Sequence, residues 1–298
     1  MLTVDFRRIV IGPGDRILDI GCGSGRHTAA AYGLQGALAV GADIRFETVL
    51  EARARLRFHE KVGAGRGTWS LNVADAGRLP FKSRSFAVVV CAEMLEHIPR
   101  EIPVLREIRR VLKPGGDLLL SVPRYWPERI CWRLSQEYHT AAGGHLRIYR
   151  RRQLIRLVED AGFQCRAYHY AHALHSPYWW LKCLLGPERP QVPPVRLYHR
   201  FLSWDIMCRP PAVRWVERLV NPLLGKSLVL YFRKADVRER SACSGGNGKP
   251  IALSETRLRS LDSLGSLGSL GLLGSLFAEP SFRHAGRMWF FPFNQSTI

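Results

Sequence analysis

The stretch that decides the fold is RILDIGCGSG, at residues 16–25. Its first half is a short apolar run, which predicts a buried strand, and its alternating glycines predict a tight turn with positive φ. Residues 26–34 are expected to form a helix. A strand that enters a helix through such a turn presents free N–H groups to polar ligand atoms. The stretch therefore predicts a ligand site, although Gly-rich turns alone do not identify the ligand.

Strand and helix patterns alternate over the following two hundred residues. Apolar, β-branched runs predict six further strands, and apolar stripes at helical spacing predict three further helices. The expected strands cover 37–43, 68–75, 85–92, 117–123, 163–174 and 227–234, and the expected helices cover 47–60, 102–112 and 151–161. In the first of these helices we expect Leu50, Ala54 and Leu56 to face the core. This order predicts βαβ units and a parallel sheet that binds ligands at the carboxyl ends of its strands.

The composition of the chain changes at about residue 237. Residues 1–237 are expected to form one domain with an insert, at about 176–226, that is rich in Trp, Tyr, Leu, Arg and Pro. Residues 238–298 include the repeat SLGSLGSLGLLGSL, whose Ser and Gly dilute the leucines too much to build a core. We therefore predict a low-complexity, disordered tail.

The chain is strongly basic. It has 44 Lys and Arg against 25 Asp and Glu, a formal net charge of +19, and most of the excess falls within residues 101–240. Such a field attracts anionic partners, which include nucleic acid, acidic lipid headgroups and anionic substrates. No uncharged apolar stretch approaches the ~20 residues that span a bilayer, and MLTVDFRRIV lacks the apolar run of a signal peptide. We expect a cytoplasmic location.

The seven cysteines are scattered, with no CxxC pair and no zinc-like spacing. A dispersed, odd number of cysteines predicts free thiols in a reducing compartment. The absence of a three-cysteine cluster argues against a radical iron–sulfur enzyme. From these spacings we expect no metal ion.

Acidic residues stand at the carboxyl ends of the next two expected strands. Asp43 ends the second strand, where a carboxylate can accept the protons of both ribose hydroxyls. Asp75 closes the third strand and is placed to meet an adenine edge, with a simple strand-end cap as the alternative. An NAD site is the alternative for the Gly-rich turn, but its GxGxG spacing lacks the third glycine of GxGxxG. The pattern favours a nucleoside site.

Five segments resemble, in order, the motifs of class I S-adenosylmethionine-dependent methyltransferases: ILDIGCGSGRHT, VGADI, VADAGRLPFKSRSF, LEHIP and VLKPGG. The chain looks most like the type 11 group, which includes the ubiquinone and menaquinone biosynthesis methyltransferases. The resemblance covers about residues 14–170 and the strand near 227–234. It implies a Rossmann-like three-layer sandwich with a mostly parallel seven-stranded sheet and an antiparallel last strand, here with a helical insert before that strand.

The sequence departs from the group at two places. Ala87 stands where the group often has Asp, and we expect little effect on the chemistry. Few residues precede the first strand, whereas the group usually has N-terminal helices that cover the cofactor. We expect the insert to take their place over the site.

The resemblance also implies which residues bind the cofactor, S-adenosylmethionine. Its methionine part would lie at the turn, its ribose at the end of the second strand and its adenine after the third. The implied cofactor-binding residues are Asp19, Gly21, Cys22, Gly23, Gly25, Asp43, Asp75 and Ala76. Glu93, after the fourth strand, would line the pocket beside the reactive sulfonium, while Glu96 and His97 are expected to cap and pack that segment.

The run GHLRIY, at residues 144–149, recurs in the resembled group near the acceptor pocket. We expect His145 to accept a proton, which makes it a catalytic residue together with Glu93. Arg147 and Tyr149 are expected to bind the substrate, Arg147 by pairing with an acidic group. The alternative is that these residues only orient their loop.

These features lead to an enzyme that methylates O, N or C of a small, lipophilic metabolite. No NPPY-like tetrapeptide and no Pro-Cys nucleophile is present, which makes a nucleic-acid substrate less favoured. The insert interleaves aromatic and Leu residues with Arg, which is typical of helices that lie on anionic membranes, of base-stacking surfaces, or of a helical cap over the sheet. An RNA or protein methyltransferase and a non-catalytic cofactor-binding domain remain as alternatives.

Overall fold

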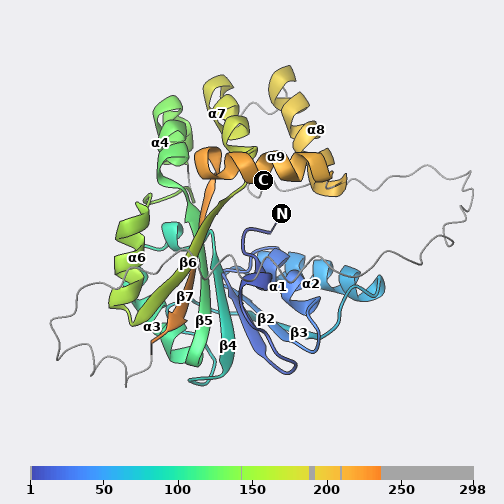
Figure 1. Ribbon diagram of the computed structural model, residues 1–298, viewed down its shortest axis with the longest axis vertical. Coiled ribbons are helices and arrows are strands. Elements are labelled where there is room, and N and C mark those ends of the chain that lie inside the picture. The colour runs from blue at the N-terminus through green and yellow to red at the C-terminus, as the bar shows by residue number, and fades with distance from the viewer. Residues whose placement is uncertain (1, 142, 188–191, 209, 236–298) are drawn as a thin grey trace, which may run out of the picture. The chain divides into compact units, whose positions relative to one another are not determined.

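The computed structural model describes residues 2–235 except 142, 188–191 and 209, so the predicted tail at 238–298 lies outside the described residues. Seven strands form one sheet in the order β3-β2-β1-β4-β5-β7-β6 (Figure 1). The strands are β1 (Arg16–Ile20), β2 (Leu38–Asp43), β3 (Thr68–Val73), β4 (Phe86–Ala92), β5 (Leu112–Pro123), β6 (Phe163–Ala171) and β7 (Ser227–Lys234). β7 is antiparallel to both of its neighbours, and the other pairs are parallel. The predicted Rossmann-like sheet is confirmed.

Helices cover both faces of this sheet. The helices are α1 (Arg26–Tyr32), α2 (Phe46–Lys61), α3 (Glu101–Val111), α4 (Tyr125–Leu134), α5 (Gln136–Thr140), α6 (Arg151–Asp160), α7 (His175–Leu185), α8 (Pro193–Cys208) and α9 (Pro211–Leu224), with short 3-10 turns at η1 (Phe6–Arg8) and η2 (Leu95–His97). Along a strand, side chains alternate between the faces, so Ile17 packs with α1 and α2 while Leu18 packs with α3 and α6. These two apolar cores make the three-layer sandwich.

Two details of the sequence prediction were wrong. In α2, Leu50 is 45% exposed and Ala54 is also exposed, whereas Val49, Ala52 and Leu56 are buried. The buried stripe follows the i, i+3, i+7 spacing of a helix face, and Leu50 lies one residue away from it. The fifth strand begins at Leu112 rather than at 117, because Leu112 already pairs with Phe86. Residues 113–116 then form a bulge, and the pairing resumes between Asp117 and Val88.

The predicted insert folds as three helices, α7 to α9. With α4, they lie beyond the carboxyl ends of the parallel strands, above the sheet in Figure 1. Of these helices, α7 and α8 share a small apolar core, built around Tyr178, Val195 and Leu202. In the part of the chain that the structure describes, no helix is long and apolar enough to cross a membrane. The cysteines of that part are free thiols.

Candidate active site

The turn between β1 and α1 is built on three glycines in the left-handed region. Gly21, Gly23 and Gly25 have φ values of 65°, 51° and 77°, which L side chains rarely adopt. A Cβ on Gly21 would stand 2.6 Å from Sδ of Met94, whereas a Cβ on Gly23 would meet nothing within 4 Å. Gly21 thus lets the segment after β4 pack on the turn, and Gly23 leaves one side of the turn open to a ligand.

Hydrogen bonds made by Asp19 and Cys22 connect this turn to α1 and β2. Asp19 is 2% exposed, and its Oδ2 accepts hydrogen bonds from the Thr28 backbone N–H (2.9 Å) and hydroxyl (2.7 Å), which fastens the first turn of α1 to β1. Burial raises the pKa of Asp19 to about 6. The Cys22 N–H donates to the Ala42 carbonyl (3.0 Å), and burial raises the pKa of its thiol. The Asp19 carboxyl therefore points into the protein, so a contribution to cofactor binding would act through the turn.

Asp43 stands at the end of β2, beside the turn. Its Oδ2 accepts a hydrogen bond from the Gly23 N–H (2.9 Å), and its Oδ1 accepts one from the Arg45 N–H (3.0 Å). A carboxylate offers about four lone-pair sites, so both oxygens keep acceptor capacity. Asp43 therefore stabilises the turn and can also accept hydrogen bonds from a ligand beside it.

Asp75 and Ala76 follow β3, the strand next to β2. The Ala74 N–H donates to the Asp43 carbonyl (2.9 Å), which brings the two acidic residues to neighbouring strand ends. The Asp75 carboxylate is exposed and accepts a bond from the Gly77 N–H (2.8 Å), while Ala76 is buried. The predicted nucleoside residues thus converge on one edge of the sheet.

Glu93 leaves β4 in an unusual backbone conformation. Its φ is 51°, in a region that costs a non-glycine residue on the order of 1 kcal/mol and recurs at functional sites. Its N–H donates to the Ser121 carbonyl (2.9 Å), and its Oε1 accepts the Ser121 hydroxyl (3.0 Å). Burial lowers the pKa of Arg26, at the start of α1, and the charge of Glu93 opposes that shift. Glu93 therefore stands between the ends of β4 and β5 and the cofactor turn.

His145 lies in the loop after α5, and its partner comes from α4. The His145 Nδ1 is 2.7 Å from Oε1 of Glu128, which is 1% exposed. Burial works to raise the pKa of Glu128, but the His145 hydrogen bond and the charge of Lys226 together hold it below its ordinary value. With Nδ1 donating to this carboxylate, Nε2 is the nitrogen left with a free lone pair.

Arg147 and Tyr149 are held by one acidic residue. Arg147 forms an ion pair with Glu101 and donates to the Pro99 carbonyl (2.9 Å). Tyr149 is 3% exposed, and its hydroxyl lies 3.3 Å from Oε1 of Glu101 and 3.4 Å from the Leu95 carbonyl. These contacts fix the loop. The predicted substrate contacts stay predictions.

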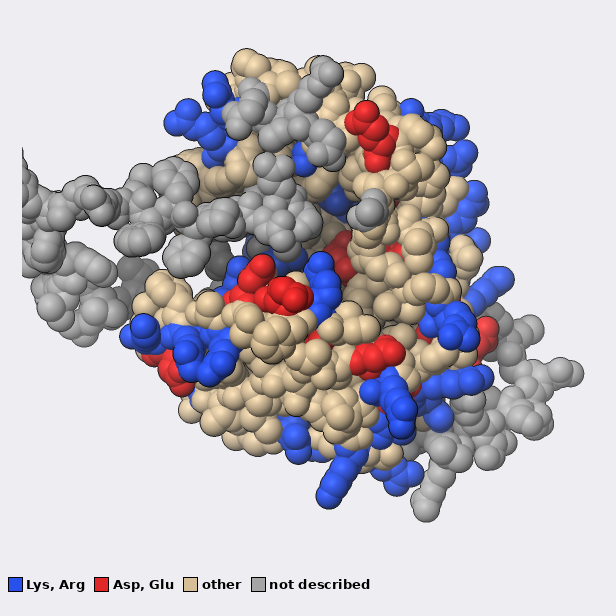
Figure 2. Space-filling view, turned by 180° about the vertical axis from the view of Figure 1, so that it is seen from behind, with Lys and Arg blue, Asp and Glu red and all other residues tan. Residues whose placement is uncertain are grey.

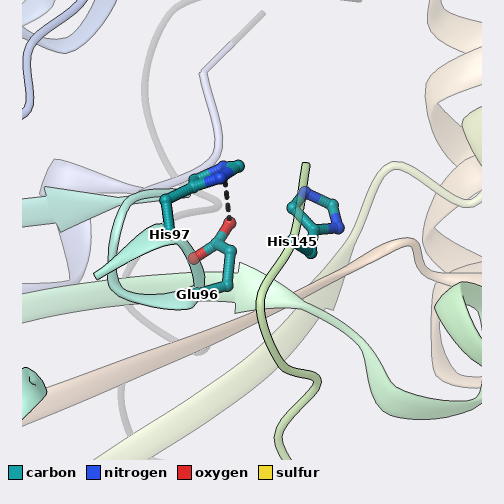
Figure 3. A group of neighbouring side chains, drawn as sticks. All are labelled: Glu96, His97 and His145. Carbon is teal, nitrogen blue, oxygen red and sulfur yellow. Dashed lines mark ion pairs between the residues drawn. The ribbon is translucent and has the colours of Figure 1, made fainter. Parts of the chain in front are cut away.

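Glu96 and His97, expected to cap and pack, lie beside His145 (Figure 3). Glu96 is completely buried, and neither of its carboxyl oxygens has a hydrogen-bond partner among the described residues. Burial first, and the charge of Glu93 second, raise its pKa well above the ordinary value. The His97 Nε2 is 3.9 Å from Oε1 of Glu96, and the rings of His97 and His145 are 5.0 Å apart. No sequence spacing could have found this group, because it joins two loops 48 residues apart.

Figure 2 shows the molecule hollowed on the face turned away in Figure 1, with acidic side chains visible inside the hollow and Lys and Arg along its margins.

A family model described as a methyltransferase domain matches residues 5–168, which is more than half of the chain. The chain belongs to this methyltransferase family.

Part of the chain is similar to named methyltransferases. Methyltransferase GfsG of Streptomyces halstedii is 33% identical over 119 residues, which cover 39% of this chain and 40% of that protein. The ubiquinone biosynthesis O-methyltransferase of Hahella chejuensis is 38% identical over 110 residues, which cover 37% and 43%. The chain thus matches about two fifths of the length of these relatives.

One solved structure of similar fold is a methyltransferase from Bacillus halodurans. It has a TM-score of 0.52 and 19% identity, and the match covers 77% of this chain and 96% of that one. At this level of identity the likeness concerns the fold alone.

S-adenosylmethionine is the cofactor of this methyltransferase, and the turn fits it. The open space over Gly23 admits a ligand to the backbone. The N-terminus of α1 follows Gly25 and supplies N–H groups, while Asp43 retains acceptors for hydroxyl groups. An acceptor-rich, glycine-lined edge of this kind suits a ribose and an amino-acid moiety.

Proposed function

We propose that this methyltransferase moves the methyl group of S-adenosylmethionine to an oxygen of a small, lipophilic acceptor. The observation that carries the proposal is the open Gly23 turn tied to Asp43 in a chain of this family. The choice of oxygen follows the printed names of relatives, among them the ubiquinone biosynthesis O-methyltransferase and the O-methyltransferase cnsE of Penicillium expansum.

On the cofactor side, each residue keeps the role that the resemblance implies. Asp43 would accept the ribose hydroxyls, and Asp75 with the Ala76 amide would contact the adenine. The remaining residues would shape or line the methionine part of the site: Asp19, Gly21, Cys22, Gly23 and Gly25. The convergence of the ends of β1, β2 and β3 supports this assignment.

The sulfonium supplies an activated methyl group, so the protein must position the acceptor, exclude water and deal with one proton. The acceptor oxygen bonds to the methyl carbon as the carbon–sulfur bond breaks, and that electron pair stays on sulfur. The hydroxyl proton passes to a base, for which we propose Nε2 of His145, held in the required tautomer by Glu128. Glu93 would line the pocket near the transferred group, and Arg147 and Tyr149 would contact the acceptor from the same loop.

We further propose that the molecule makes peripheral contact with an anionic membrane. Leu197, Phe201 and Trp204 follow helical spacing on α8, and all three are exposed. Trp215 and Leu219 repeat that spacing on α9, and exposed Arg side chains stand among them on both helices. An apolar stripe that faces outward beside cationic groups is the pattern of helices that lie on a membrane surface.

Transfer of labelled methyl groups to a cell extract tests the proposed function. The expected result is label in a low-molecular-weight fraction that organic solvent extracts, and much less transfer by the Asp43→Ala variant at the same cofactor concentration. Label in RNA or protein would favour the polymer-methylating alternatives. The absence of any transfer despite cofactor binding would identify a binding domain and overturn the proposal.

A further inference from the structure

The group Glu96, His97 and His145 has the composition and geometry of a metal site. One carboxyl oxygen and one nitrogen of each ring all lie within 4.8 Å of one another. In Figure 3, the His97 ring lies over the Glu96 carboxyl and the His145 ring stands beside it. Two ligands around a tetrahedral zinc ion are separated by about 3.4 Å, so the 3.9 Å between His97 and Glu96 needs only a small contraction.

The environment of the Glu96 carboxyl group indicates that an ion binds there. It is 0% exposed, and both of its oxygens are without hydrogen-bond partners in the described part of the chain. A buried carboxyl group in this state carries the full cost of lost hydration. An ion bound by Glu96 would remove that cost.

Outer contacts already orient both imidazoles. The His97 Nδ1 lies 3.1 Å from the Gly144 carbonyl, and the His145 Nδ1 lies 2.7 Å from the Glu128 carboxylate. A metal-binding histidine usually donates its second ring N–H to a carbonyl or a carboxylate in this way, which fixes the tautomer and leaves the other nitrogen for the ion. Both Nε2 atoms are therefore left to bind.

We propose that Glu96, His97 and His145 bind a divalent first-row transition-metal ion, with Zn²⁺ as the probe. Two imidazoles and one carboxylate suit such ions, and three protein ligands leave positions open for a further oxygen. The charges nearby favour a cation, since the negative charges of Glu93 and Glu128 both act on Glu96. The metal site itself does not depend on the proposed function, and only its role in methyl transfer rests on it.

A second group of similar composition, His172, His175 and Glu217, is less suited to a cation. One Glu217 oxygen is already paired with Arg214 at 2.9 Å. The charges of Lys226, Arg214 and Arg26, all positive, act on His175. This group therefore serves as the internal control.

In methyl transfer, the ion would bind the acceptor hydroxyl at an open position and lower its pKa. The proton would then leave to water, and the oxygen would attack the methyl carbon as the carbon–sulfur bond breaks. In this arrangement His145 is a ligand and not the proton acceptor. If methyl transfer continues after the metal is removed, His145 keeps its role as the proton acceptor.

The test is Zn²⁺ titration of the full chain after chelator treatment, followed by calorimetry, with S-adenosylmethionine affinity measured on the same samples. We expect one Zn²⁺ per chain, lost in both Glu96→Gln and His97→Asn and unchanged in His175→Asn. Glu128→Gln, which removes only an outer contact, should weaken binding by about 10- to 100-fold.

The absence of stoichiometric binding, retention of binding in both ligand variants, or an equal loss in His175→Asn would overturn the metal site. Two ligand variants are used because either could disturb folding, and retained cofactor affinity shows that the fold is intact. Failure of the wild type to bind S-adenosylmethionine would instead count against the proposed function. The two failures are thus distinguishable.

Discussion

At the scale of single residues, Asp19 makes stability depend on pH. Burial raises its pKa to about 6 in the folded state, against 3.8 for an ordinary Asp. The folded state therefore binds the Asp19 proton more tightly than the unfolded chain, and the associated stability is complete below about pH 4 and lost as the pH rises through 6. The loss amounts to about 3 kcal/mol.

Urea unfolding of the wild type and Asp19→Asn at pH 4.5 and 7.5 measures this effect. The wild type should lose more stability than the variant as the pH rises, because Asn does not ionise. The difference between the two proteins cancels the contribution of other titrating groups. Identical changes in both would show that Asp19 does not carry the effect.

Asp43 links the shape of the turn to the binding of the cofactor. Asp43→Ala removes the acceptor for the Gly23 N–H and the proposed acceptor for the ribose hydroxyls. Hydrogen bonds to a charged group contribute about 1.5–3 kcal/mol each, so calorimetry should show S-adenosylmethionine affinity reduced by at least about 10-fold. Asp43→Asn keeps the size and one acceptor, and we expect a smaller loss. Unchanged affinity in the Ala variant would mean that the ribose lies elsewhere.

At the scale of elements, the turn between β1 and α1 depends on its last glycine. A Cβ on Gly25 would lie 2.9 Å from the Cβ of Ala52 on α2, and the φ of Gly25 is 77°. Gly14 has a similar φ of 81° with nothing within 4 Å. Gly25→Ala should therefore reduce the free energy of unfolding by about 1–3 kcal/mol more than Gly14→Ala. Equal losses in urea unfolding would show that α1 and α2 can separate at no cost.

The sequence predicts most elements because strands and helices here follow regular apolar patterns. It does not predict α4, whose first turn contains Pro127 and whose N-cap, Arg124, makes no capping hydrogen bond from its side chain. A proline is tolerated there because the first N–H groups of a helix have no intrahelical partner, but it hides the helix in the sequence. Glu128, which orients His145, was missed for the same reason.

The residues of the candidate site also separate into those that the sequence could place and those that it could not. The residues predicted to bind the cofactor could be placed from the sequence, because each lies at or just after the end of a strand and parallel strands end on one edge. The group around Glu96 was not, because His145 comes from a distant loop that the fold brings back to η2. Spacing rules for metal ligands cover only residues that are close in sequence. A prediction of no metal from such spacings therefore says little about ligands that meet in three dimensions.

At the scale of the whole molecule, the net charge of +19 and the outward apolar stripes of α8 and α9 act together. Cationic groups draw a protein to an anionic bilayer over about a Debye length, and apolar side chains then hold it there. Co-sedimentation with vesicles that contain an anionic phospholipid should therefore show binding that weakens with salt, and vesicles of neutral lipid alone should bind much less. Binding that is independent of salt and lipid charge would contradict the proposal.

A matched pair of variants tests the surface that makes this contact. Trp215 on α9 and Phe58 on α2 are both 63% exposed, but only Trp215 belongs to the surface proposed to contact the membrane, the exposed apolar faces of α8 and α9. Burial of a large apolar side chain contributes about 1.5–3 kcal/mol, so Trp215→Ser should weaken vesicle binding by about 10-fold and Phe58→Ser should leave it unchanged. If both variants bind like the wild type, the outward face of α9 does not contact the bilayer, and the charge alone accounts for the attraction.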